Sequence, residues 1–182
     1  MKFQKIIITG GTRGIGRALV DKFLQEDCEI HVIARNFQEQ PTDSNLIFHS
    51  LDLTKVHEVS SFCENFISSF GVPDLLINNA GSISTSLFQM TSVDKYKELF
   101  EINFYSQILF TQTILKSMMK TKRGNIVFIS SSSGIDGNEG RSAYVSSKAA
   151  IIGQSKVLSR ELGRYNIRVN TVCPTFVLTP MV

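Results

Sequence analysis

Long hydrophobic runs are missing from this sequence. No apolar stretch approaches the roughly 20 residues of a membrane-spanning helix. The N-terminal apolar run, residues 6–8, is too short for a secretion signal. Lys and Arg (19) barely outnumber Asp and Glu (16), and no basic run alternates with aromatic residues. We therefore expect a soluble, cytoplasmic protein that binds neither a membrane nor a nucleic acid.

Metal-ligand and disulfide patterns are missing as well. The sequence contains only 3 Cys and 3 His, which are far apart and lack the spacing of a ligand set. We expect reduced thiols and no bound metal ion. These residues are Cys28, Cys63, Cys173, His31, His49 and His57.

What is present is a chain of 182 residues, of which 42% are hydrophobic and 19% charged. This composition is ordinary for a globular protein, and the length suits one domain with a substantial core. We therefore treat residues 1–182 as a single domain.

Six short, mostly apolar runs have the composition of buried β-strands, and helical patterns lie between them. This alternation predicts an α/β fold: a doubly wound parallel sheet (Rossmann fold) with three layers, α/β/α, and strand order 3-2-1-4-5-6. The predicted strands are 5–9, 29–34, 46–51, 75–78, 125–130 and 168–173. The helical patterns cover 15–23, 56–67 with Thr54 as N-cap, 96–118, and 143–163 with Gly163 as a stop.

The chain ends unusually. An apolar tail runs from Pro174 to Val182 with no helix after it, so the last strand would keep an open edge. We expect a chain truncated after the sixth strand.

Glycines cluster between the first strand and the first helix, in the stretch Thr9-Gly10-Gly11-Thr12-Arg13-Gly14-Ile15-Gly16. Glycine allows a tight turn and the close approach of a pyrophosphate, to which the helix N-terminus offers N–H groups and partial positive charge. In a first βαβ unit this pattern predicts a dinucleotide-binding loop.

The end of the second strand indicates the type of cofactor. An acid there would bind the 2′-hydroxyl of NAD, but the chain has Ala34-Arg35-Asn36, and the next acid, Glu39, lies in the following loop. Arg35 and Arg13 could together hold a 2′-phosphate, which suits guanidinium geometry. NADP(H) is therefore favoured over NAD(H), the alternative being two solvated surface arginines.

Polar or small residues follow the third and fourth strands. Asp52, which precedes Leu53, could accept a hydrogen bond from the adenine amino group or serve as the N-terminal acid of the next helix. Asn79, Ala80 and Gly81 leave room for a ribose where bulky side chains would block it.

Two further polar features stand out. Asn103 falls in register with the apolar face of its helix, where an unpaired amide would cost a few kcal/mol, so it either bonds to a polar site or distorts the helix. Residues 130–133, all Ser, follow the fifth strand at the edge where α/β sheets bind ligands. A hydroxyl there could bond a substrate carbonyl; the run is otherwise a polar loop.

Tyr144 and Lys148 lie four residues apart and so share one helical face. A lone phenol titrates near pH ~10, and a neighbouring ammonium favours its phenolate. The pair could therefore transfer protons near pH ~7, although Tyr-x-x-x-Lys alone also occurs by chance.

Taken in order, the glycine loop, residues 78–81, Asn103, the serine run, Tyr144 and Lys148 resemble the short-chain dehydrogenase/reductase family, classical type, and within it the 3-oxoacyl-[acyl-carrier-protein] reductases. The resemblance implies an NADP-dependent oxidoreductase that reduces a ketone or aldehyde, or oxidises a secondary alcohol. It makes Tyr144 the proton donor to the carbonyl, acidified by Lys148, which also holds the nicotinamide ribose. It further makes Ser131 the catalytic serine and Asn103 the anchor of a water that links Lys148 to solvent.

The resemblance also implies a homodimer or homotetramer assembled through the helices that carry Asn103 and Tyr144. Thr175 departs from the family, which has Gly after this Pro, and the segments that would cover the substrate are missing, so the sequence does not identify the substrate. The alternatives are a non-catalytic dinucleotide-binding module and an enzyme that uses the hydride internally. The implied cofactor contacts are Gly10, Thr12, Arg13, Gly14, Ile15, Gly16, Arg35, Asp52, Leu53, Asn79, Ala80, Gly81, Tyr144, Lys148, Pro174, Val177 and Thr179.

Overall fold

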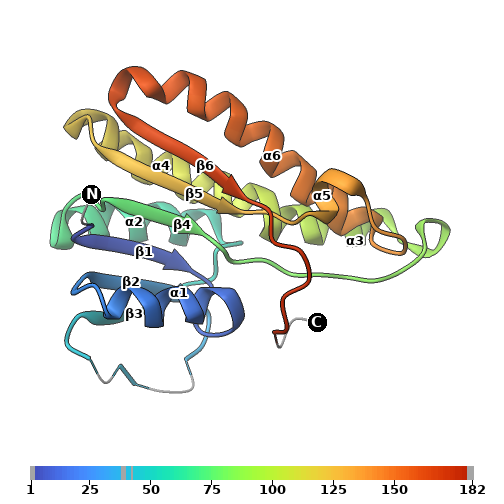
Figure 1. Ribbon diagram of the computed structural model, residues 1–182, viewed down its shortest axis with the longest axis horizontal. Helices are drawn as coiled ribbons and strands as arrows, with labels where there is room; N and C mark the ends of the chain where they lie inside the picture. The colour runs from blue at the N-terminus through green and yellow to red at the C-terminus, as the bar shows by residue number, and fades with distance from the viewer. Residues whose placement is uncertain (1–2, 38–39, 42, 180–182) are drawn as a thin grey trace.

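The computed structural model describes residues 3–37, 40–41 and 43–179. Within these residues, six parallel strands form one sheet in the order β3-β2-β1-β4-β5-β6, which confirms the predicted doubly wound Rossmann fold (Figure 1). Glu39 and the last residues of the tail, 180–182, lie outside the described residues. The strands are β1 (Lys5–Thr9), β2 (Glu29–Ala34), β3 (Leu46–Ser50), β4 (Leu75–Asn78), β5 (Gly124–Ile129) and β6 (Ile167–Val172).

Among the described residues, helices connect every pair of consecutive strands except β2 and β3. The predicted patterns 15–23 and 56–67 each lie within one observed helix, whereas 96–118 extends over several helical segments and 143–163 runs one residue past its α-helix. Short 3₁₀ turns add to them at Phe88–Met90 and Gly163–Tyr165. The described α-helices are α1 (Gly14–Leu24), α2 (Val56–Phe70), α3 (Val93–Phe100), α4 (Ser106–Thr121), α5 (Ser133–Asp136) and α6 (Ser142–Leu162).

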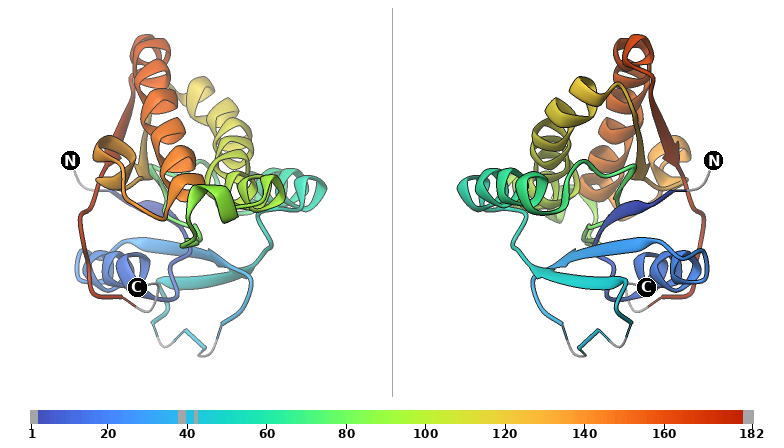
Figure 2. Two further views of the ribbon diagram at one scale, coloured as in Figure 1. Left: turned by 90° about the vertical axis from the view of Figure 1, so that its right-hand side faces the viewer. Right: turned by 90° about the vertical axis from the view of Figure 1, so that its left-hand side faces the viewer.

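The central strands of the sheet are buried on both faces, whereas alternate residues of the edge strand β6 are exposed. Along β1, Ile7 packs toward α2, α4 and α6, whereas Ile6 and Ile8 pack toward α1. Figure 2 shows α1 on one side of the sheet and α2, α4 and α6 on the other. Because helices cover both faces of the central strands, β1 and β4 are mainly apolar, and the functional loops gather at the strand ends.

Some local predictions are wrong. Thr54 is not the N-cap of α2, because Lys55 occupies that position and Thr54 instead donates its N–H and hydroxyl to Asp52 Oδ1, at 3.0 and 2.8 Å. The predicted stop at Gly163 is confirmed, because α6 ends at Leu162 with Gly163 as its C-cap. Gly163 also begins a 3₁₀ turn, and the left-handed residue that follows this turn is Asn166, with φ of 56°. Asparagine tolerates this conformation. The predicted ends of β3, β5 and β6 are displaced by one residue.

The long helix predicted around Asn103 is continuous but irregular. α3 passes into a π-helical segment, Glu101–Tyr105, before α4 begins. Asn103 lies in the middle of this segment and is fully buried. Such π-helical insertions are frequent at functional sites.

A chain of polar side chains crosses the α2 side of the first three strands. Lys5 lies 3.3 Å from the Glu29 carboxylate, Glu29 Oε1 lies 2.8 Å from His31 Nε2, and His31 Nδ1 lies 2.9 Å from His49 Nε2. His31 is fully buried, and both imidazoles pack against the ring of Phe66. Burial lowers the pKa of both histidines, and that of His49 to about 4, with His31 adding to the effect.

The two histidines in this chain of polar side chains, His31 and His49, should make the protein less stable in mild acid. An unfolded histidine binds its proton at about pH 6.5, so stability is lost as the pH falls from there toward the folded value of about 4. We expect the free energy of unfolding in urea to be about 1 kcal/mol lower at pH ~5 than at pH ~7, a value reduced because His49 is only half-buried. His49→Gln should diminish this difference, whereas His57→Gln, at an exposed position of α2, should preserve it. Equal pH dependence in both variants would contradict the prediction.

Candidate active site

The loops after β1, β4 and β5 meet at the carboxyl edge of the sheet, beside the start of α6 and the tail (Figure 1). β4 pairs with β1 on one side and with β5 on the other, which makes these loops neighbours. Open α/β sheets bind ligands at this edge, where the strand order reverses.

The glycine loop is held tightly against the end of β4. Gly10 is left-handed, with φ of 67°. At Gly16 a Cβ would lie 2.3 Å from Gly10 O and 2.5 Å from Asn79 Nδ2, so a larger residue would displace backbone. Asn79 Nδ2 donates to the carbonyl oxygens of Thr9 and Gly10, both at 3.0 Å.

The start of α1 suits an anion. No side chain caps the helix at Arg13, and the first N–H groups of a helix lack intrahelical partners and attract negative charge. The tail reaches this loop, since Thr179 Cβ lies 3.2 Å from the position of a Cβ on Gly14. Pro174 O accepts from Ser132 N at 2.9 Å, which ties the start of the tail to the serine loop. The structure thus brings Thr179 and Gly14, two predicted cofactor contacts, together.

Arg35 and Asp52 lie at the ends of adjacent strands. Arg35 follows β2 and is exposed. The pKa of Asp52 is lowered chiefly by the N–H of Thr54 and also by the positive charge of Arg35. Asp52 therefore bonds the turn that leads into α2, whereas the acid in the first turn of this helix is Glu58; the contact of Asp52 with adenine stays a prediction. The Leu53 side chain is buried in the core, which leaves only its backbone for a cofactor contact.

Asn103 links three segments of the site. Its Oδ1 accepts from Ser82 N at 2.7 Å, and its Nδ2 donates to Ser82 O at 2.9 Å and to Ser147 Oγ at 3.0 Å. Ser147 Oγ donates in turn to Tyr144 O at 2.7 Å. The π-helical segment is therefore joined both to the loop after β4 and to the turn of α6 that carries Tyr144.

Lys148 is buried beside Tyr144. Its Nζ lies 5.9 Å from the centroid of the Tyr144 ring and donates to Ile129 O at 2.9 Å. Burial lowers the pKa of Lys148 to about 8, and the nearby thiol of Cys173 opposes this shift. A Cβ on Gly81 would lie 3.4 Å from Lys148 Nζ, so glycine keeps the space beside the ammonium open.

The serine loop packs against the same turn of α6. Ser130 Oγ donates to Lys148 O at 2.8 Å, and Ser131 Oγ accepts from Ser133 N at 3.2 Å. A Cβ on Gly134 would lie 3.0 Å from Ala149 N, which shows how closely α5 approaches α6. The loop that carries Ser131 is thus fixed relative to Lys148.

Sequence reasoning missed three residues of this site. Thr9 Oγ1 accepts from the N–H groups of Asn79 and Ala80, at 3.0 and 3.1 Å, and Ser147 and Cys173 were assigned no role. A hydroxyl at the end of an otherwise apolar strand was the available signal for Thr9. Ser147 lies three residues after Tyr144, on the same helical face.

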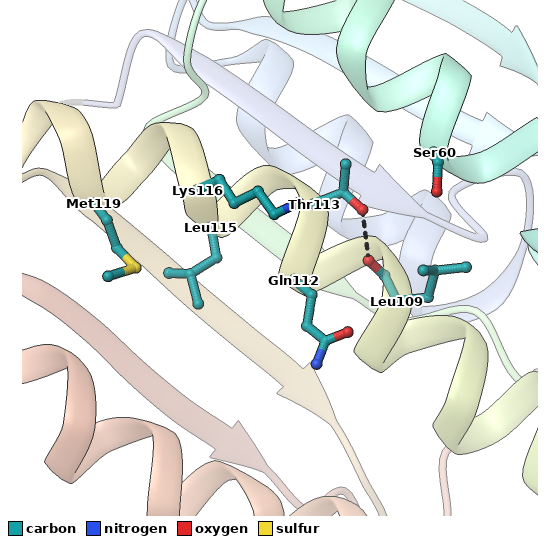
Figure 3. A pocket seen from close by; sticks show the side chains of 7 residues that line it. All are labelled: Ser60, Leu109, Gln112, Thr113, Leu115, Lys116 and Met119. Carbon is teal, nitrogen blue, oxygen red and sulfur yellow. Dashed lines mark hydrogen bonds between the residues drawn. The ribbon is translucent and has the colours of Figure 1, made fainter. Parts of the chain in front are cut away.

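No described helix has the length and apolarity needed to cross a membrane, and no described cluster of 3 or more His, Cys, Asp or Glu could hold a metal ion. A cavity of about 380 Å³ lies between α2 and α4, and none of the predicted site residues lines it (Figure 3). Its lining consists of Ser60, Leu109, Gln112, Thr113, Leu115, Lys116 and Met119.

Comparison with known proteins agrees with this geometry. A family model described as short chain dehydrogenase matches residues 4–182. The 3-oxoacyl-[acyl-carrier-protein] reductase FabG of Chlamydia muridarum is 33% identical, covering 96% of this chain and 74% of the relative. The solved structure of ElxO with NADP bound has a TM-score of 0.92 at 31% identity, covering 99% of this chain and 76% of that one. A 4-hydroxyisoleucine dehydrogenase complexed with NADH has a TM-score of 0.88 at 29% identity, covering 97% and 77%. With its dinucleotide-type loop and its Tyr144–Lys148 pair, the chain belongs to the short-chain dehydrogenase family of oxidoreductases.

Proposed function

We propose that this chain is an NADP-dependent oxidoreductase that interconverts a ketone or aldehyde and the corresponding alcohol, with Tyr144 as proton donor. The observation that carries the proposal is the buried ammonium of Lys148, 5.9 Å from the Tyr144 ring, at the carboxyl edge of the sheet. A cation held there favours the phenolate and so makes the phenol a stronger acid.

The residues present fit a nicotinamide dinucleotide. The glycine loop and the uncapped start of α1 suit a pyrophosphate, and Gly81 leaves space for a ribose beside Lys148. When bound, the cofactor supplies the hydride. The protein's own contribution is to bind and orient both reactants.

Proton transfer would use the residues around Lys148. In reduction, the Tyr144 hydroxyl gives its proton to the carbonyl oxygen, and the Lys148 ammonium stabilises the resulting phenolate. The Ser131 hydroxyl donates a hydrogen bond to the oxygen as negative charge develops on it. Asn103 positions this turn of α6 through Ser147.

The preference for NADP(H) rests on Arg35 and Arg13. Arg35 follows β2, Arg13 lies in the loop after the adjacent strand β1, and both are exposed. A 2′-phosphate would form charge-assisted hydrogen bonds with these guanidinium groups. The similar structures include both an NADP and an NADH complex, so we infer the preference of this chain from Arg13 and Arg35.

Arg35→Ala should weaken NADPH binding about tenfold while changing NADH binding less than about twofold, because only NADPH presents the 2′-phosphate. Calorimetric titration with each cofactor measures both effects. Arg164→Ala, at an exposed residue after α6, is the matched control and should leave both affinities unchanged. Equal losses for the two cofactors would remove the assignment.

The function itself is tested by titrating the purified chain with NADPH and then offering a panel of ketones and aldehydes. We expect saturable binding and carbonyl-dependent loss of NADPH absorbance. Binding without turnover of any carbonyl compound would favour a dinucleotide-binding module instead.

We further propose that two or four copies associate through α4 and α6. The π-helical segment just before α4 exposes Tyr105 (54%), and α6 exposes Val157 (49%). Analytical ultracentrifugation should show a dimer or tetramer, and a monomer at micromolar concentration would contradict this assembly.

A further inference from the structure

The π-helical segment and α4 form one continuous helix, and three polar side chains are buried along one of its faces, where apolar side chains would be expected. Asn103, Gln107 and Thr111 follow one another at four-residue spacing, and each is at most 2% exposed. Each is hydrogen-bonded to the segment 78–82, which closes β4 and continues past it. The pairs are Asn103–Ser82 at 2.9 Å, Gln107–Ala80 at 2.8 Å and Thr111–Asn78 at 2.9 Å. We call these three pairs the polar ladder.

The ladder arises from two matching repeats. Four residues of a helix rise about 6 Å, and two residues of an extended chain span about 6.6 Å. Every fourth helical residue therefore meets every second residue of the segment, over three successive pairs. The intervening residues, Asn79 and Gly81, are left to face elsewhere.

Stability alone does not explain these side chains. The partner of Gln107 is a carbonyl oxygen, which can only accept, so the amide nitrogen must face it. Among the described residues, Gln107 Oε1 and Asn78 Oδ1 then have no hydrogen-bond partner. A buried unpaired acceptor is unfavourable, so an apolar residue at position 107 would remove the penalty of Gln107 Oε1 while leaving Ala80 O without this donor. Violations of this kind are typical of functional sites.

The segment held by the ladder borders the proposed cofactor site. Asn79 bonds the glycine loop, and Gly81 lies beside both Asn103 and Lys148. We propose that Gln107 is a positioning residue: by binding Ala80 it holds residues 79–81 in place, so that the space for the nicotinamide ribose beside Lys148 stays open. This inference rests on the proposed function.

Gln107→Met tests it, because methionine keeps the length of glutamine without its hydrogen bonds. In the cofactor-free protein, amide hydrogen exchange across residues 78–84 should become about tenfold faster, with β1 and β5 unchanged. NADPH should bind about tenfold more weakly, whereas ADP 2′-phosphate, which lacks the nicotinamide ribose as well as the nicotinamide, should change less than about twofold. Gln112→Met, at an exposed residue of α4, is the matched control and should alter neither measurement.

Unchanged exchange across residues 78–84 would overturn the proposal, and so would equal weakening of both ligands, which indicates general loosening. If Gln107→Met does not fold, Thr111→Val breaks the neighbouring pair with an isosteric side chain and should give the same pattern. If the unsubstituted chain binds no NADPH, the proposed function fails, while the exchange experiment still decides whether the ladder holds the segment.

Discussion

Replacing Tyr144 with phenylalanine is expected to lower kcat by about a thousandfold or more, while the affinity for NADPH stays within about twofold. The substitution keeps the ring that packs against Leu99 and Ala143 and removes only the hydroxyl. Without that hydroxyl no positioned group can protonate the carbonyl oxygen. The buried Lys148 cannot replace it, because its Nζ is directed to Ile129 O and lies 5.9 Å from the ring centroid.

The measurement compares single-turnover rates and NADPH titrations for the two proteins on one confirmed carbonyl substrate. It should use the longest natural chain that contains these residues. Tyr165→Phe, in the 3₁₀ turn after α6, is the matched control and should retain full activity. A Tyr144→Phe variant that keeps most of its turnover would show that another group donates the proton.

Lys148→Met should damage the proposed activity more broadly and yet stabilise the fold. Turnover and NADPH affinity should both fall, because one ammonium acidifies Tyr144 and binds the ribose. Burial lowers the pKa of Lys148 to about 8, so the charged form is disfavoured in the folded protein. Removing the charge should raise the free energy of unfolding near pH ~7 by at most about 3 kcal/mol. The gain is reduced because Ile129 O loses its hydrogen-bond donor.

The contribution of Lys148 to the free energy of unfolding should depend on pH. Between the folded pKa of about 8 and the unfolded value near 10.5, the unfolded chain binds the extra proton, so stability contributed by this group rises with pH. Urea unfolding of the cofactor-free protein should show this rise in the parent chain and lose it in Lys148→Met. Lys156→Met, on the exposed face of the same helix, should keep it. A Lys148→Met variant that is less stable than the parent at neutral pH would show that the buried ammonium supports the fold.

The candidate site contains buried polar groups that lower the stability of the folded protein. The charge of Lys148 and the unpaired acceptors of Asn78 and Gln107 are buried around one loop, residues 78–82. Apolar substitutions there should be tolerated by the fold and not by the proposed activity. This separation between stability and function is common at sites that bind charged ligands.

Much of the fold follows from local patterns in the sequence. Strands such as 5–9 and 75–78 are mainly apolar because helices cover both faces, and the helices between the strands show their own periodicity. Errors occurred where short-range chemistry competes. Thr54 donates to Asp52 instead of capping α2, where Lys55 is the N-cap.

The candidate site, like the fold, could be predicted from the sequence only where its residues lie close together along the chain. Tyr144 and Lys148 could be paired from sequence, because a spacing of four residues fixes their proximity on any helix. The partners of Asn103 could not, since Ser82 and Ser147 lie 21 and 44 residues away along the chain. The sequence offered two roles for Asn103, bonding to a polar site or distorting the helix, and both are found at one place.

The sequence by itself determined the order of strands and helices, the dinucleotide-type loop and the Tyr144–Lys148 pair, because these depend on spacing within single elements. Only the tertiary structure decided what Gln107, His31 and Ser147 contact. Their hydrogen bonds join elements whose relative placement is set by how side chains of the helices pack on the sheet, and that packing leaves no periodic signal in the chain.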